Sequence, residues 1–401
     1  MSSPALGIAG MGIASSIGIG KDAVARALFA GTRGLIPRDD LIPGRTVHVG
    51  GVTGPLPPVP RGLESMECRN GRLMLASVAE ITESVVEAAD RFGRDRIAVV
   101  LGTSTSGIAE GEAAYRAFRQ NGTWPADFHY RQQEPGNLGE FVARALGLTG
   151  PAYTVATACS SSGKAFASAR RLIRAGLADA AVVGGADTLC RTTVGGFAAL
   201  EAISGGLCSP FSRNRDGINI GEAAAVFLLT PASAPVQFLG VGESSDAYHI
   251  SAPDPGARGA LMAMRAALDD AGMTPADIAY VNLHGTGTAL NDAMEGKAVH
   301  ALFGAAIPCS STKAMTGHTL GAAAACEAAF LWLALHPDYN PDGRLPPHLW
   351  DGEADPSIPP LALADVGMRL PNDLRRVAML SNSFAFGGSN VALVLARGGT
   401  H

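Results

Sequence analysis

A cysteine stands between an apolar run and a stretch of small residues, in a place that suits a nucleophile. The run AYTVATA leads into Cys159, and SSSGKAFASA follows it. The first segment is typical of a buried strand and the second of the opening of a helix. The helix dipole and the free N–H groups there favour negative charge, which predicts a thiol that ionises more readily than usual. The alternative is a buried structural thiol, because free cysteine is among the most buried residue types.

Two histidines occupy segments that also favour chemistry. His284 lies in NLHGTGTALND, directly after the apolar run DIAYV, and Thr286 and Thr288 supply hydroxyl groups beside it. His318 lies in STKAMTGHTLGAAAA, where we expect the start of an alanine-rich helix. No cysteine or glutamate stands at an offset from either histidine that would make a zinc site. Taken singly, each histidine could equally be structural.

A lysine and a glutamate flank His318 in the same apolar segment. Lys313 precedes it, and Glu327 follows Lys313 by about four helical turns. A buried ammonium group is costly unless it is paired, so we expect Lys313 and Glu327 to form an ion pair that orients His318. The alternative is that one of the two side chains reaches solvent.

The chain repeats its order of elements, which predicts two similar α/β halves. The segment 96–107 resembles 277–288, the segment 151–173 resembles 307–333, and the segment 217–230 resembles 385–397. We place the boundary near residue 232, with the cysteine in 1–232 and both histidines in 233–401. Because equivalent strand ends meet in the middle of such a pair of halves, we expect Cys159, His284 and His318 to lie together.

Composition narrows the class of protein. Charged residues make up 17% of the 401 residues and hydrophobic residues 47%, which indicates extensive burial and an oligomer interface. The net charge of −5 gives no strong attraction to nucleic acid or membrane. Six cysteines without C-x-x-C pairs indicate free thiols in a reducing compartment. The N-terminus lacks a signal peptide and a membrane span, so we expect a soluble cytoplasmic protein.

Six motifs in the same order resemble the elongating β-ketoacyl-acyl carrier protein synthases of the thiolase superfamily. They are TACSS, HGTGT, STKAMTGHTLGAA, SNSFAFGGSN, SSDAYHISAPDP and PFSRNRDGINIGE. The resemblance covers nearly the whole chain. It implies an α/β, thiolase-like fold in which two duplicated halves form a layered α-β-α-β-α core.

The resemblance also implies a set of roles. Cys159 would carry the acyl group, while His284 and His318 would stabilise the enolate that forms when malonyl carrier protein loses carbon dioxide. Lys313 and Glu327 match the buried charged pair of the family. Backbone N–H groups of Cys159 and Phe386 would hold the oxyanion at the acyl carbonyl.

Further residues would contact the substrate, and no bound cofactor is implied. Thr286 and Thr288 would contact the phosphopantetheine arm, which arrives on the carrier protein. Phe197 matches the aromatic residue near the malonyl site, and Phe384 and Phe386 belong to the gating loop. The implied chemistry needs no metal.

Two departures from the family pattern point towards a specialised synthase. Glu201 stands where relatives often carry a basic or small residue that helps to dock the acidic carrier. Thr105 stands where an apolar residue of the acyl pocket is expected. These differences favour polyketide or aryl-polyene-type synthesis over housekeeping fatty-acid synthesis. The acyl carrier protein is the expected partner, in a homodimer or in a heterodimer with a related ketosynthase-like chain.

Four other functions fit the sequence less well. A degradative thiolase would carry a second cysteine near SFAFGGSN, and a chain-starting synthase would carry asparagine in place of one histidine. A papain-like hydrolase is disfavoured by Lys313, Glu327 and the internal duplication. A non-catalytic subunit that sets chain length typically lacks the active cysteine, so Cys159 argues against it; it remains the main alternative.

Overall fold

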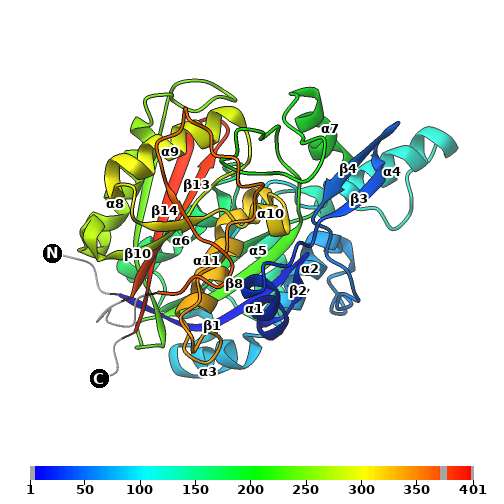
Figure 1. Cartoon of the computed structure of the whole chain (residues 1–401). Helices are drawn as coiled ribbons and strands as arrows, with labels where there is room; N and C mark the ends of the chain where they lie inside the picture. The colour runs from blue at the N-terminus through cyan, green and yellow to red at the C-terminus, as the bar shows by residue number, and fades with distance from the viewer. Residues whose placement is uncertain (1–4, 371–376, 399–401) are drawn as a thin grey trace.

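The protein is described by a computed structural model that covers residues 5–370 and 377–398, and it has a large mixed sheet at its centre (Figure 1). The sheet contains twelve strands in the order β12-β11-β10-β13-β14-β9-β1-β8-β7-β5-β6, with β2 paired to β1. A separate hairpin joins β3 and β4. The strands are β1 (Leu6–Ser15), β2 (Gly18–Ile19), β3 (Ile36–Ile42), β4 (Arg45–Val49), β5 (Ile97–Gly102), β6 (Ala152–Val155), β7 (Ala180–Asp187), β8 (Ala223–Thr230), β9 (Val236–Ser245), β10 (Ile278–Asn282), β11 (Pro308–Ser310), β12 (Ala362–Leu363), β13 (Ala378–Ala385) and β14 (Ser389–Arg397).

The sheet order confirms the duplication predicted from the repeated segments. The run β6-β5-β7-β8-β1 in the first half is matched by β11-β10-β13-β14-β9 in the second. In both runs the outer pairs are parallel and the inner pairs are antiparallel. The halves join through β1 and β9, where only Leu6 with Phe238 and Gly7 with Gln237 are in register. The predicted boundary at residue 232 lies between β8 and β9, and the division into two domains stays a prediction.

The helices complete the layers. They are α1 (Lys21–Phe29), α2 (Arg69–Val78), α3 (Thr82–Phe92), α4 (Ile108–Asn121), α5 (Asn137–Leu146), α6 (Ser161–Arg174), α7 (Arg191–Ala199), α8 (Arg258–Ala271), α9 (Ala289–Phe303), α10 (Lys313–Thr316) and α11 (Ala323–Leu335). The first half carries α2, α3 and α5 on its outer face, and the second carries α8 and α9. Between the halves, α6 and α11 contact each other and strands of both. This arrangement confirms the α-β-α-β-α core.

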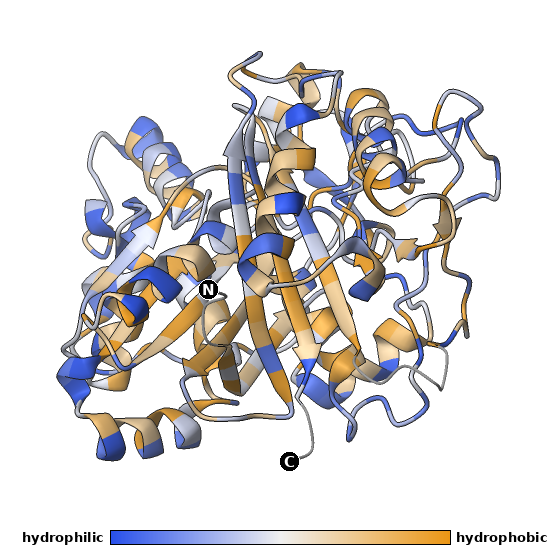
Figure 2. Ribbon diagram, turned by 90° about the vertical axis from the view of Figure 1, so that its left-hand side faces the viewer, coloured by the Kyte–Doolittle hydropathy of each residue, from blue (hydrophilic) through white to orange (hydrophobic). Residues whose placement is uncertain are grey.

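The apolar strands explain why both faces of the sheet are covered. In β5, Ala98 and Val100 pack in the central cluster with α6 and α11, while Val99 and Leu101 pack in the outer cluster with α2 and α5. Strands covered on both faces are largely apolar, and much of their length is orange in Figure 2. All thirteen residues of α11 are buried, as the absence of charge along most of this helix predicts.

The second central helix differs from the prediction in one important place. The pattern from residue 314 onward predicts one helix that starts near His318, but α10 ends at Thr316 and α11 begins at Ala323. The backbone N–H of His318 donates to the Asn219 carbonyl at 2.7 Å, and its carbonyl accepts from Gly221 N at 2.9 Å. Gly317, with φ of 73°, makes the required turn. His318 is therefore held by a strand-like contact with a distant segment and not by a helix.

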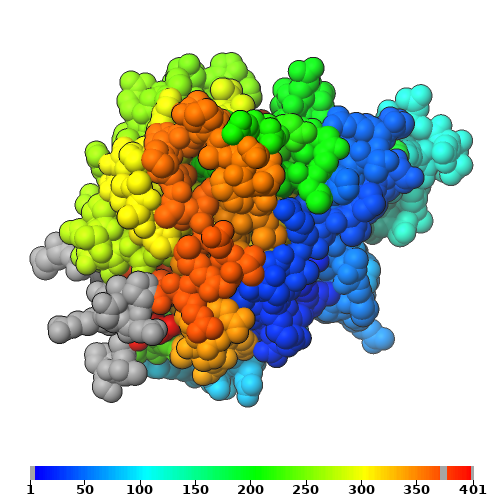
Figure 3. Space-filling model, in the orientation of Figure 1, coloured from blue at the N-terminus to red at the C-terminus, as the bar shows by residue number. Residues whose placement is uncertain are grey.

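After α11 the chain crosses the surface between the two halves. This orange segment lies between the yellow helices of the second half and the blue elements of the first in Figure 3. Its His348 accepts from the backbone N–H of Ser311 at 3.0 Å through Nδ1, and its Nε2 lies 3.0 Å from the Pro210 carbonyl. The crossing segment thus fixes the backbone just before Lys313.

Candidate active site

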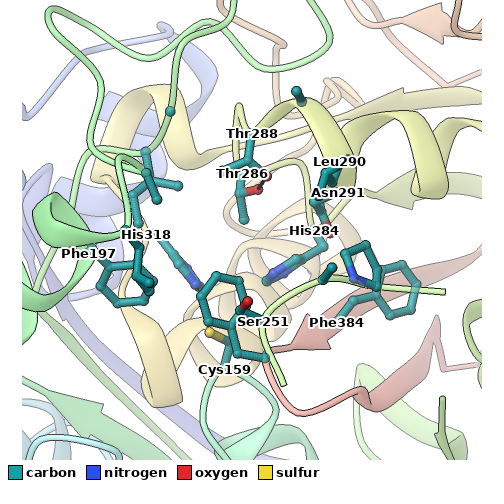
Figure 4. Close-up of a pocket in the computed structure, with 18 of the residues that line it drawn as sticks. Cys159, Phe197, Ser251, His284, Thr286, Thr288, Leu290, Asn291, His318 and Phe384 are labelled. Carbon is teal, nitrogen blue, oxygen red and sulfur yellow. Dashed lines mark hydrogen bonds between the residues drawn. The ribbon is translucent and has the colours of Figure 1, made fainter. Parts of the chain in front are cut away.

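Cys159 lies on a strained turn between β6 and α6. Ala158, the residue before it, has a left-handed φ of 52°, which is uncommon for a residue with a side chain. Ser160 is the N-cap of α6, so the cysteine stands at the mouth of this helix as predicted. Backbone strain of this kind is concentrated at functional sites. The turn aims the thiol out of the central layer and into a cavity (Figure 4).

The thiol is held beside His318 in a buried environment. Cys159 Sγ lies 3.0 Å from His318 Nε2. Burial raises the pKa of the Cys159 thiol to about 12, although the Lys313 ammonium group and the backbone N–H groups of Phe386 and Cys159 act to lower it. The prediction that the thiol ionises readily is therefore wrong for the resting site, because burial outweighs these favourable neighbours.

His284 approaches the same point from the second half. The ring centroids of His284 and His318 lie 5.2 Å apart, and the rings are nearly perpendicular at 85°. Lys313 Nζ lies 3.4 Å from His284 Nδ1. An ammonium group can only donate, so Nδ1 accepts and the ring proton sits on Nε2. Burial and the positive charge of Lys313 lower the pKa of both histidines well below the usual value, which keeps the rings neutral.

Lys313 and Glu327 form the predicted ion pair, and its direct contact is with the other histidine. Lys313 Nζ donates to Glu327 Oε1, and both side chains are buried, so the alternative in which one reaches solvent is wrong. Burial raises the pKa of Glu327 to about 7, and Lys313 opposes this rise. The hydrogen-bond contact of Lys313 is with His284, whereas its positive charge also lowers the pKa of His318. The predicted electrostatic effect on His318 is therefore present, and the direct contact with His284 is an addition to it.

The structure places five of the predicted substrate residues around one cavity of about 360 Å³ (Figure 4). Thr286 and Thr288 lie on one wall, and their hydroxyl oxygens are 3.0 Å apart. The ring of Phe384 lies 6.1 Å from that of His284. Phe386 lies at the mouth, with its ring 5.6 Å from that of Phe197. Cys159 and both histidines line the same cavity.

Thr105, the sixth predicted substrate residue, lies outside the set that lines this cavity. Its hydroxyl donates to the buried carboxylate of Asp187 at 2.9 Å. Asp187 also accepts from Thr103 and Ser104, and from the backbone N–H of Gly321 at 2.5 Å. This carboxylate ties the end of β5 to the turn that follows His318. A role of Thr105 in the acyl pocket stays a prediction.

Asp187 and Glu295 are site-supporting residues that the sequence analysis missed. Glu295 is fully buried and accepts from the backbone N–H groups of His284 and Gly285, both at 2.7 Å. Burial raises its pKa to about 7. Asp187 ends the apolar run AAVVGGAD, and Glu295 lies in an otherwise largely buried helix face. A lone acidic residue in such surroundings is the signal that could have revealed them.

Within residues 5–370 and 377–398, no group of three or more histidine, cysteine or acidic side chains is placed to hold a metal ion. None of the helices in that same part of the chain is long and apolar enough to cross a membrane.

Two sequence families cover most of the chain. Residues 59–234 match the N-terminal domain of the beta-ketoacyl synthases, and residues 236–344 match the C-terminal domain. Among curated proteins, 3-oxoacyl-[acyl-carrier-protein] synthase 2 of Staphylococcus aureus (strain COL) is 33% identical and aligns with 76% of this chain and 75% of its own length. Nodulation protein E of Rhizobium sp. (strain N33) is also 33% identical, over 81% and 82%.

Solved structures of ketosynthases share the fold. One chain of the complex between the ketosynthase ApeO and its chain length factor ApeC, from Xenorhabdus doucetiae, is 45% identical to this chain, with a TM-score of 0.92 and 98% of each chain covered. The ishigamide ketosynthase/chain length factor is 28% identical, with a TM-score of 0.86 and coverage of 99% and 100%. The expected thiolase-like fold and enzyme class are thereby confirmed. The chain belongs to the β-ketoacyl synthase family of acyltransferases.

Proposed function

We propose that this chain condenses an acyl group on Cys159 with malonyl-acyl carrier protein to give a β-ketoacyl-acyl carrier protein. The observation that carries the proposal is the 3.0 Å contact of Cys159 Sγ with His318 Nε2, beside the neutral ring of His284 in the same cavity. This arrangement offers a nucleophile, a base for its proton and a hydrogen-bond donor for a developing oxyanion.

The first step transfers the acyl group. His318 Nε2 accepts the thiol proton, the sulfur of Cys159 attacks the carbonyl of the carrier-bound thioester, and the carrier sulfur leaves with the returned proton. The backbone N–H groups of Cys159 and Phe386 face the cysteine sulfur. These groups would also hold the oxyanion that forms on the acyl carbonyl. The products are an acyl-cysteine and a free carrier thiol.

The second step joins the two chains. Malonyl carrier protein enters, its carboxylate leaves as carbon dioxide, and the electron pair moves onto the thioester oxygen as an enolate. His284 donates from Nε2 to this oxygen, because Lys313 occupies Nδ1. His318 lines the same cavity and supplies the second hydrogen bond to this oxygen, in the neutral tautomer that carries its proton on Nε2. The enolate carbon then attacks the acyl carbonyl, and the sulfur of Cys159 leaves.

The phosphopantetheine arm of the carrier would occupy the part of the cavity that leads outward. Thr286 and Thr288 present hydroxyl groups to it, and Phe197 lies on the opposite side (Figure 4). No further cofactor takes part in the proposed reaction. The gating role of Phe384 and Phe386 belongs to this proposal as well.

We further propose that the chain acts in a polyketide or aryl-polyene-type pathway, paired with a related ketosynthase-like chain. The similarity to the ApeO–ApeC complex, at 45% identity, supports this pairing. The edge strand β6 and the helix α4, of which only Ala114 is buried, also present surfaces that a second chain could cover. The alternative, a non-catalytic subunit that sets chain length, does not explain why Cys159 and both histidines are assembled.

The proposal is tested by the mass of the intact protein after mixing with an acyl-loaded carrier protein. We expect a gain equal to the acyl group, and no gain in Cys159→Ala. His284→Ala should still be acylated but should release little carbon dioxide from malonyl carrier protein. Normal condensation by His284→Ala would refute the assigned role. Absence of acylation with several acyl groups, in the presence of the partner chain, would favour the scaffold alternative.

A further inference from the structure

The mouth of the catalytic cavity is surrounded by exposed apolar side chains. Leu200, Leu290 and Phe386 line the cavity and are 58%, 62% and 38% exposed. Ile250 is 80% exposed, and its carbonyl accepts from the backbone N–H of Gly387, next to Phe386. Single exposed apolar residues are ordinary, but a group around one opening marks an interaction site. We call Leu200, Ile250, Leu290 and Phe386 the apolar rim.

The rim comes from four separate segments of the chain. Leu200 is the C-cap residue of α7, Ile250 lies in the loop after β9, Leu290 lies in the first turn of α9, and Phe386 follows β13. These segments surround one opening, and together they form a surface wider than any one of them. A partner that covers the opening must therefore contact all four at once.

The charged groups at the mouth are mainly acidic. Glu201, Asp216 and Asp246 line the cavity, and Arg215 is the one arginine or lysine among the described residues that do so. The Arg215 side chain is 6% exposed and donates to Asp355 at 2.5 Å. Its charge is therefore already compensated inside the protein, whereas Glu201 is exposed. An acidic partner surface would meet charges of its own sign here.

We infer that the apolar rim is the docking surface for an acyl carrier protein whose surface around the phosphopantetheine arm is apolar and not acidic. This inference rests on the proposed function, since the arm must pass through this opening to reach Cys159. The carrier body then covers the rim while the arm occupies the cavity. Apolar contact supplies the attraction, and Glu201 selects against carriers with acidic docking surfaces.

The test compares three octanoyl donors in the acylation of Cys159, with the partner chain present. They are octanoyl-pantetheine, an octanoylated acidic bacterial carrier protein, and a variant of that carrier whose acidic residues beside the modified serine are changed to amides. We expect the neutralised carrier to show an apparent KM at least threefold lower than the acidic carrier. Docking by opposite charges predicts a higher KM instead, and that result would overturn the inference.

Two variants and a control separate the rim from the rest of the surface. Ile250→Ser should raise the KM of both carriers at least fivefold more than that of octanoyl-pantetheine. Glu201→Gln should lower the KM of the acidic carrier. The control Val86→Ser changes a residue on α3, on the outer face of the first half, that is 46% exposed, and it should alter none of the three.

The outcomes distinguish the inference from the function on which it rests. If neither octanoyl-pantetheine nor either octanoylated carrier acylates the wild-type protein, the proposed function is wrong. If pantetheine acylation is normal while Ile250→Ser leaves carrier kinetics unchanged, the docking surface lies elsewhere and only the inference is wrong. A KM for the acidic carrier that rises tenfold from 50 to 500 mM salt would also refute it, because apolar contacts are not screened.

Discussion

The substitution Asp187→Asn separates two effects of this buried carboxylate. Its hydrogen bonds stabilise the fold, and its negative charge raises the pKa of the Cys159 thiol. Its Oδ1 accepts from Thr103, Thr105 and the backbone N–H of Ser104, and its Oδ2 accepts from the Ser104 hydroxyl and from the backbone N–H of Gly321. An asparagine keeps the shape and can keep its oxygen towards the β5 loop. Its NH₂ group then faces the Gly321 N–H, and two donors cannot pair.

The expected cost follows from that one lost contact. A buried donor that loses a charged acceptor costs about 1–3 kcal/mol. Ser104 Oγ lies 3.1 Å from the Gly321 N–H and offers a second acceptor, so we expect about 1–2 kcal/mol of lost stability. The loss of the negative charge of Asp187 has a separate effect, on the pKa of the Cys159 thiol. Asp187 raises the pKa of Cys159, so its removal lowers that pKa and makes the thiol more reactive at a given pH.

Two measurements check these effects together. Urea unfolding gives the change in stability, and the rate of iodoacetamide labelling at Cys159 between pH 6 and 10 gives the shift of the thiol. Labelling must be read peptide by peptide, because all six cysteines are free thiols. The control Asp179→Asn breaks an exposed pair with Arg96 and should change neither the stability appreciably nor the labelling rates. A labelling rate at Cys159 that is unchanged or lower in Asp187→Asn at each pH would refute the reasoning.

Three further predictions concern neighbouring groups. Lys313→Met should slow iodoacetamide labelling of Cys159 at pH 8, because the ammonium group lowers the pKa of the thiol; labelling as fast as in the wild type would contradict this. The raised pKa of Glu295 means that the free energy of unfolding falls by about 3 kcal/mol as the pH rises from 4.5 to 7. Denaturation at several pH values should show that the free energy of unfolding falls less steeply with pH in Glu295→Gln than in the wild type. An equally steep fall in the variant would exclude Glu295 as the cause. Phe386→Ala should change the rate or chain-length preference of acyl transfer, measured with a series of acyl carriers. Kinetics identical to those of the wild type would show that the Phe386 ring has only a packing role.

The nucleophile, the two histidines and the doubled fold could be predicted because their signals are local. Short motifs surround Cys159, His284 and His318, and repeated apolar runs mark equivalent strands. The break before α11 could not be predicted in this way. It depends on the hydrogen bonds of His318 with Asn219 and Gly221, which lie about a hundred residues earlier in the chain. Local propensity favours a helix there, and tertiary contacts override it.

The electrostatic differences between prediction and structure also arise from contacts between segments that are far apart in the sequence. The helix N-terminus at Cys159 is visible in the sequence, but the burial that raises the thiol pKa depends on what the second half places over it. Lys313 likewise lies near His318 in sequence and contacts His284 in space. Distances along the chain give the members of the site, whereas the packing of the two halves decides which members touch.

The contacts that hold the halves together are spread over the central helices, while the candidate reacting groups are a few side chains at the boundary between the two halves. A duplicated gene could therefore lose Cys159 and still encode a chain that folds and keeps its surfaces. Natural selection could retain such an inert copy for its shape alone, beside an active sister. In this architecture, catalysis and assembly are separable traits, and a paralogue can inherit one without the other.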